Sequence, residues 1–157
     1  MNAILQLLEK DHQEALGLIS DLEAADEILG TDSTDSEKFD CLNAALKLHT
    51  KIEEEFVYPL MADVDETRDL IQEFYKEHEK MDELLAQLSA MTPKQSEFRE
   101  LLPQLQDMLE SHISKEEDEL FPRIDETIDR EELNILEMRM QELKNGSKLK
   151  ASAAKQR

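Results

Sequence analysis

The stretch HTKIEEEFVYP at residues 49–59 returns further along the chain as HISKEEDELFP at residues 112–122. Both copies read H-x-x-x-E-E, followed by an aromatic residue and a proline at the same offsets. A step of four residues turns an α-helix by only ~40°, so the histidine and the first glutamate of each copy share one face. Similarly, DHQEALGLI at residues 11–19 is matched by EHEKMDELL at residues 77–85. The sequence therefore predicts two helical hairpins, each with a histidine on its first helix and H-x-x-x-E on its second.

Apolar residues at helical spacing predict four long helices around these motifs. The helices span residues 2–29, 37–61, 66–90 and 92–121, with a polar loop at 30–36 and a shorter fifth helix at 130–143. Pro59 marks an end or a kink, Pro122 is expected to end the fourth helix, and Pro103 predicts an irregular turn or a late start within it. The expected fold is an all-α, antiparallel up-and-down four-helix bundle at residues 1–144, followed by a flexible basic tail at 145–157.

The composition excludes several classes of function. Among 157 residues, 38 are acidic and 18 are basic, and a net charge of −20 argues against a nucleic-acid partner and against an anionic membrane surface. Three glycines and four prolines are too few for the tight turns of an all-β protein. The single cysteine, Cys41, excludes an internal disulfide and a cysteine-based zinc site, and we interpret it as buried filler. No apolar stretch is long enough to span a membrane, and we expect a cytoplasmic protein.

Each of the four histidines falls on the apolar stripe of a different predicted helix: His12, His49, His78 and His112. One inward histidine is commonly an ordinary core residue, but four converging imidazoles are costly to bury unless something binds them. Glu53 and Glu116 belong to the same inward faces, and a buried carboxylate without a cation is also unfavourable. Two hairpins packed about a pseudo-twofold axis would bring these six side chains together.

Four imidazoles and two carboxylates form a suitable ligand set for two metal ions bridged by the carboxylates. Imidazole and carboxylate without thiolate suit Fe, Mn or Zn, and a structural zinc site normally closes with four ligands. Two histidines per metal, shared carboxylates and a solvent-derived oxo or hydroxo bridge still leave room for an exogenous ligand, which favours a di-iron centre. A ferritin-like centre needs Glu-x-x-His on two helices, and here that spacing occurs once, at Glu9 and His12.

In this pattern the sequence resembles the hemerythrin family, and within it the bacterial hemerythrin-like cation-binding domains. The resemblance covers residues 1–125 and rests on His12, His49-x3-Glu53, His78 and His112-x3-Glu116, with E-E-x-x-x-[YF]-P in both copies. It implies a non-haem, oxo-bridged centre of two Fe ions that binds O₂ or a related diatomic molecule between the helices. We expect one iron at His12 and His49, the other at His78 and His112, and Glu53 and Glu116 between them.

One departure from the family concerns the third helix. Oxygen-carrying hemerythrins have a fifth histidine one turn from the ligand on that helix, whereas the neighbours of His78 are Phe74 and Asp82. The four-histidine set is more similar to di-iron proteins linked to nitric-oxide stress and iron–sulfur repair. A missing ligand opens a coordination position, unless Asp82 fills it. Phe74 shares its stripe with Phe56 and Met81, which either wall the metal pocket or belong to the ordinary core.

Other residues near the motifs have simpler interpretations. Glu54 and Glu117 are interpreted as solvated, with a role in orienting a histidine as the alternative. Tyr58 and Phe121 lie nine residues past their histidines, ~180° around an ideal helix, and are expected to pack at the bundle end unless a kink at the proline re-aims Tyr58.

The sequence thus predicts a di-iron protein that binds or reacts with O₂, NO or peroxide in sensing, storage or stress defence, with an unidentified redox partner. It leaves open whether that chemistry is enzymatic. An iron buffer or donor, for example for iron–sulfur repair, is the alternative, and a bundle in which metal only holds the helices together is a third.

Overall fold

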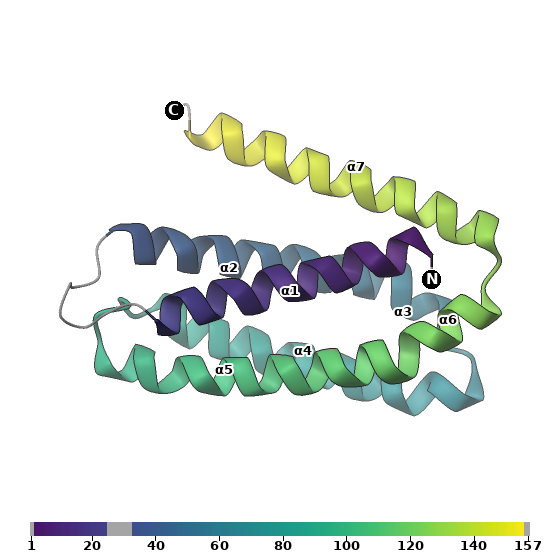
Figure 1. Ribbon diagram of the computed structural model, residues 1–157, viewed down its shortest axis with the longest axis horizontal. Coiled ribbons are helices and arrows are strands. Elements are labelled where there is room, and N and C mark those ends of the chain that lie inside the picture. Colours follow the sequence, from purple (N-terminus) through teal and green to yellow (C-terminus); the bar gives the residue numbers. More distant parts are fainter. Residues whose placement is uncertain (1, 25–32, 156–157) are drawn as a thin grey trace.

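The computed structural model describes residues 2–24 and 33–155, with side chains described at residues 2–24 and 35–147. These residues form an antiparallel four-helix bundle with a further helix laid along one side (Figure 1). The bundle consists of α1 (Ala3–Glu23), α2 (Ser33–Ile52), α4 (Asp65–Ser89) and α5 (Ser96–Lys115). In it, α1 packs on α2 and α5, and α4 packs on α5 and α2. The described residues contain no β-strand, and the predicted all-α up-and-down bundle is confirmed.

In each hairpin, one π-helical turn extends the second helix. The two turns are η1 (Glu53–Val57), which leads into α3 (Tyr58–Met61), and η2 (Glu116–Leu120), which leads into α6 (Phe121–Thr127). Each π turn begins at the first glutamate of a repeated motif. The motif is therefore repeated in backbone conformation as well as in sequence.

Pro122 does not end the fourth helix as predicted, and the reason lies in the π turn before it. The amide of Phe121 donates to the carbonyl of Glu116, five residues back instead of four. A proline has no N–H and its ring collides with the carbonyl four residues earlier, and the wider turn relieves that collision. The same arrangement precedes Pro59, where the chain stays helical to Met61.

Several other helix boundaries differ from the predicted ones. α1 ends at Glu23, and the predicted continuation over residues 25–29 lies outside the described residues. α2 begins at Ser33, so the second half of the predicted loop at 30–36 is helical. α5 begins at Ser96 instead of 92, because the preceding residues form a turn in which the amide of Gln95 donates to the carbonyl of Thr92 over 3.0 Å.

Pro103 lies inside α5, where the sequence predicted an irregular turn or a late start. The neighbouring side chains of Phe98, Leu102 and Leu105 are buried in the bundle. Burial contributes about 1.5–3 kcal/mol for each large apolar side chain, which together exceeds the ~3 kcal/mol that an internal proline costs. Tertiary packing therefore keeps α5 continuous through Pro103.

The last helix, α7 (Arg130–Lys155), is longer than the predicted helix at 130–143. The expected inward residues Leu133, Leu136 and Met140 are buried, and α7 packs on α1. Gly146 lies within α7, where a glycine costs only about 1 kcal/mol. The segment predicted as a tail is thus helical up to Lys155, and the division of the chain at residue 144 stays a prediction.

The apolar core is divided into two clusters by a layer of polar side chains. One cluster holds the start of α1, the start of α4, the segments after both π turns and the buried face of α7. The other holds the end of α1, the first part of α2, the end of α4 and most of α5. Between them lie the buried histidines and glutamates of the repeated motifs. Over residues 2–24 and 33–155, no helix has the length and apolar character needed to cross a membrane.

Replacing Pro103 by alanine is expected to raise the free energy of unfolding by about 1–3 kcal/mol, because a main-chain hydrogen bond is restored and the ring is removed from an exposed helix face. Urea denaturation followed by circular dichroism measures the change. The exposed neighbour Gln104 provides the control, since Gln104→Ala should change stability by less than about 0.5 kcal/mol. A less stable Pro103→Ala variant would contradict the explanation.

Candidate metal centre

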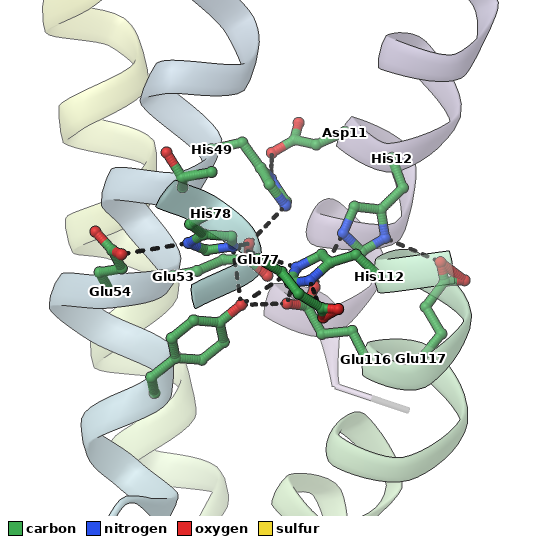
Figure 2. A network of polar contacts seen from close by, with 12 residues as sticks. Asp11, His12, His49, Glu53, Glu54, Glu77, His78, His112, Glu116 and Glu117 are labelled. Atoms are coloured by element: carbon green, nitrogen blue, oxygen red, sulfur yellow. Dashed lines mark hydrogen bonds and ion pairs between the residues drawn. The ribbon is translucent and has the colours of Figure 1, made fainter. Parts of the chain in front are cut away.

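The six predicted ligand residues meet in the polar layer at the middle of the bundle (Figure 2). All are buried, and the most exposed is His49 at 6%. They form two overlapping groups, His12, His49, Glu53 and Glu116, and Glu53, His78, His112 and Glu116. Within each group, one nitrogen or oxygen atom per residue lies within 4.8 Å of all the others. The predicted residues are thus brought together, in the predicted pairs of histidines, while their role as ligands stays a prediction.

Each glutamate lies between two histidines, one from each pair. Glu53 Oε1 is 3.1 Å from His49 Nε2 and 3.4 Å from His78 Nε2. Glu116 Oε1 is 3.1 Å from His12 Nε2, and its Oε2 is 2.9 Å from His112 Nε2. Because both carboxylates span the two pairs, they occupy the positions expected of bridging groups.

Several atoms at the centre are buried without a hydrogen bond. They are Nε2 of His12, Nε2 of His49, both carboxylate oxygens of Glu53 and Oε1 of Glu116. Four of these atoms face one another in pairs at 3.1 Å, as ion-pair contacts that lack hydrogen-bond geometry, and five such atoms in one place are difficult to explain as packing. Lone pairs directed at shared cations would account for all of them, so the donor set fits two metal ions.

The electrostatics of the centre favour positive charge. Although burial lowers the pKa of His49, the charge of Glu53 and the hydrogen bond to Asp11 raise it to about 10. Burial also lowers the pKa of His112, but the hydrogen bonds to Glu116 and Glu77 outweigh it and raise the pKa to about 10. Burial raises the pKa of Glu53, but the charge of His49 outweighs it and holds the pKa well below its usual value. The potential that binds protons to these rings would also attract metal cations.

Every histidine is held at its outer nitrogen by a carboxylate (Figure 2). His12 Nδ1 is 2.9 Å from Glu117 and His78 Nδ1 is 3.3 Å from Glu54. His49 Nδ1 is 3.1 Å from Asp11, and His112 Nδ1 is 3.1 Å from Glu77. A carboxylate at Nδ1 keeps a proton there, so that Nε2 faces the centre and offers its lone pair once the ring has lost its second proton, as a metal ion would require.

The outer carboxylates follow the symmetry of the repeat. The acid before the histidine of each first helix reaches the other histidine of its own hairpin: Asp11 contacts His49, and Glu77 contacts His112. The acid after each buried glutamate reaches the opposite hairpin. Glu54 and Glu117 remain partly exposed, with side chains 39% and 24% accessible to solvent, and the alternative of orienting a histidine also fits the geometry. Asp11 and Glu77 were missed, although an acid precedes the histidine in both hairpins.

Tyr58 points to the centre instead of packing at the bundle end. Its hydroxyl donates to Glu116 and lies 3.2 Å from His78 Nε2 and 3.5 Å from His112 Nε2. The π turn inserts about one residue, or ~100° of rotation, between His49 and Tyr58, which brings the ring to the inward face. Burial and the charges of Glu53 and Glu116 raise the pKa of Tyr58 well above its usual value, so the hydroxyl keeps its proton.

The equivalent position in the second hairpin carries Phe121. Its ring stacks on His12 with the centroids 6.0 Å apart, as the ring of Tyr58 stacks on His78 at 5.5 Å. A phenol beside His78 and His112 and a phenyl beside His12 make the two halves of the centre chemically different. Phe121 was also expected at the bundle end, and the shift has the same cause.

The neighbours of His78 on its own helix do not complete the centre. Asp82 is exposed on α4 and lies outside both groups. Phe74 is buried and meets the ring of His112 edge-on, with the ring centroids 4.8 Å apart. It therefore lines the site, which was one of its two predicted roles. Met81 belongs to the apolar cluster formed by the end of α1, the first part of α2, the end of α4 and most of α5. Phe56 is only half-buried, because the π turn rotates it outward.

Cys41 lies on α2 away from the centre. It is exposed, which contradicts its interpretation as buried filler.

Comparisons with known proteins agree with this geometry. A family model described as the hemerythrin HHE cation-binding domain matches residues 3–124. A DNA nickase from Nostoc sp. (strain PCC 7120) is 30% identical over 121 residues, which are 77% of this chain and 33% of that protein. The chain thus spans about a third of the length of that relative. A crystal structure of a hemerythrin HHE cation-binding domain-containing protein from Mycobacterium kansasii has the same fold, with a TM-score of 0.76 and 22% identity over 96% of this chain and 91% of the other.

Replacing Tyr58 by phenylalanine is expected to lower the free energy of unfolding of the metal-free protein by about 1–3 kcal/mol, because Glu116 loses a donor in a buried environment. Chemical denaturation measures the difference. Tyr75 is a matched control, since its ring packs edge-on against Tyr58 at 5.4 Å and Tyr75→Phe should change stability much less. Equal effects of the two substitutions would contradict a specific role for the hydroxyl of Tyr58.

Proposed function

The chain belongs to the hemerythrin HHE cation-binding domain family, and we propose that its buried cluster holds two iron ions and binds or reacts with O₂, NO or peroxide. We place this activity in sensing, storage or oxidative and nitrosative stress defence. The observation that carries the proposal is the pair of overlapping ligand groups that share Glu53 and Glu116. Two ions in neighbouring positions, joined by the same two carboxylates, are the simplest occupants of such a set.

In the proposed centre, His12 and His49 hold one ion and His78 and His112 hold the other. Each ion then has two imidazoles and a share of two carboxylates, which leaves room for a small exogenous ligand. Iron is favoured over zinc because a structural zinc site normally closes with four protein ligands of its own. When bound, a pair of iron ions supplies the Lewis-acid and redox chemistry that diatomic molecules and peroxide require.

The protein would contribute orientation, a proton and exclusion of water. The four outer carboxylates fix the rings so that every Nε2 faces inward. Tyr58 holds a proton at its hydroxyl oxygen, directed at Glu116 beside the His78 and His112 pair. Phe74 and Phe121 cover two of the histidines with apolar rings. A ligand entering the centre would therefore meet a polar interior enclosed by the two apolar clusters.

A role as an iron buffer or donor is the second candidate. It is favoured by a groove of about 580 Å³ between α1, α2 and α7, which has His49 and Asp11 among its lining residues. An ion held near such an opening could exchange with a chelator or a partner. The buffer would release iron readily and show no saturable response to a diatomic ligand, which separates the two functions.

The activity of the DNA nickase is not part of the proposal. The matched region is a third of that protein, and a net charge of −20 opposes binding to phosphates. A cytoplasmic setting and a redox partner, both expected from the sequence, stay predictions.

Freshly purified protein is expected to contain about two iron ions per chain, one for each ligand group, and to be coloured, because ferric ions held by carboxylate and imidazole ligands would absorb near-ultraviolet and visible light. Elemental analysis and an optical spectrum in air test this. Azide and nitric oxide should change the bands in a saturable manner. A colourless protein with one zinc ion per chain would contradict the proposal.

Replacing Glu53 by alanine should reduce the iron content by half or more, because the glutamate is shared by both proposed positions. Glu55 lies in the same π turn with an exposed side chain, and Glu55→Ala should retain full occupancy. Glu116→Ala should behave as Glu53→Ala does. Full occupancy in both glutamate variants would rule out the bridging role.

A further inference from the structure

One contact between the C-terminal helix and the candidate centre is made by a lysine. Lys144 of α7 lies with its Nζ 2.5 Å from Oδ1 of Asp11, and the other oxygen of Asp11 is 3.1 Å from His49 Nδ1. The single carboxylate of Asp11 therefore connects Lys144 of α7 with His49, a proposed ligand. Both partners are largely shielded, with side chains 19% and 16% exposed, so this ion pair is screened by solvent less than a surface pair.

The second hairpin has an equivalent chain of contacts within the bundle. There Lys115 lies 3.0 Å from Glu77, and Glu77 holds His112 Nδ1 at 3.1 Å. Lys115 belongs to α5 and sits beside Glu116, so its position is fixed by the same helix as the ligand. Lys144 comes instead from a helix that lies beyond the residues 3–124 matched by the family model. One histidine thus depends on how α7 is docked, and its counterpart does not.

The groove beside this contact lies on the same half of the centre. It is bounded by α1 and α2 on one side and by Gln141, Lys144 and Ser147 of α7 on the other. His49 is one of its lining residues and is the most exposed of the six candidate ligands. If α7 moved away, this half of the centre would be the first to meet solvent.

We propose that α7 controls retention of the ion at the His12 and His49 position, with Lys144 as a positioning residue. Lys144 holds Asp11 against His49, and Asp11 holds the ring so that Nε2 stays directed at the ion. When the Lys144 contact is broken, Asp11 is free to turn into the groove and His49 loses its orientation. The ion at this position then leaves through the groove, while the ion at His78 and His112 stays. The inference rests on the proposed function, because it needs two ions.

The test is the release of iron from the loaded 157-residue chain to an excess of a strong iron chelator, followed by absorbance. Lys144→Met removes the charge and keeps a side chain of similar length. We expect half of the iron in this variant to leave several-fold faster, up to the roughly tenfold or more that loss of Asp11, the partner of His49 itself, would produce. The other half should leave at the wild-type rate, and Lys144→Arg should restore slow release.

Lys10 is the matched control. It lines the same groove and pairs with Glu14 at 3.9 Å on the exposed face of α1. Lys10→Met removes the same charge without touching Asp11, and its iron release should match that of the wild type. Asp11→Asn is a second variant, which leaves α7 unchanged in sequence and should accelerate the same half of the iron.

The outcomes separate this inference from the function on which it rests. Unchanged release in Lys144→Met from a wild type that holds two ions would overturn the role of Lys144 alone. Faster release of all the iron, or equal acceleration in Lys10→Met, would also overturn it, because global loosening or charge alone would then be the cause. A wild-type protein that holds no iron would reject the proposed function and this inference together.

Discussion

The structure depends on compensation of charge in a polar layer that cuts through an apolar core. Two fully buried carboxylates and four buried imidazoles lie between two apolar clusters, and a buried charge without a counter-charge costs several kcal/mol. The outer carboxylates satisfy the Nδ1 atoms of the rings and direct the Nε2 atoms inward. They also add negative charge around the centre. The whole arrangement is balanced by cations, whether protons on the rings or metal ions between them.

The π turns make this layer possible within regular helices. Each begins at a buried glutamate and rotates the following aromatic residue onto a histidine ring of α1 or α4. A proline follows each π turn and fits its wider backbone. In both turns, the amide of the residue before the proline donates to the carbonyl five residues earlier. The repeated motif therefore encodes a buried histidine, a buried glutamate and the π turn that places an aromatic ring over the site. The second copy has Phe121 where the first has Tyr58, and this difference distinguishes the two halves.

Much of the fold and the candidate site could be predicted, because both depend on helical spacing. The four histidines fall on apolar stripes, and the H-x-x-x-E spacing places a glutamate one turn away on the same face. Tyr58 was misplaced because an ideal helix was assumed through the π turn. Asp11 and Glu77 were missed because a residue adjacent to a ligand points ~100° away on its own helix, and only the packing of two helices shows that its carboxylate reaches the neighbour. The length of α7 was underestimated because Gly146 and the basic composition resemble a chain end, whereas one glycine costs a helix little.

On the proposed ligand set, the polar layer would also link the lifetime of the chain to its supply of metal. Without metal, the two apolar halves are held together across a plane of charged and unpaired groups, so separation of the helices is least opposed there. A ligand that binds only the folded state stabilises it by RT ln(1 + [L]/Kd), about 2.7 kcal/mol at a hundredfold excess over Kd. On the proposed ligand set, scarcity of the ion would increase the fraction of unfolded chains that proteases degrade. Abundance of the protein would then follow availability of the metal without any change in its synthesis.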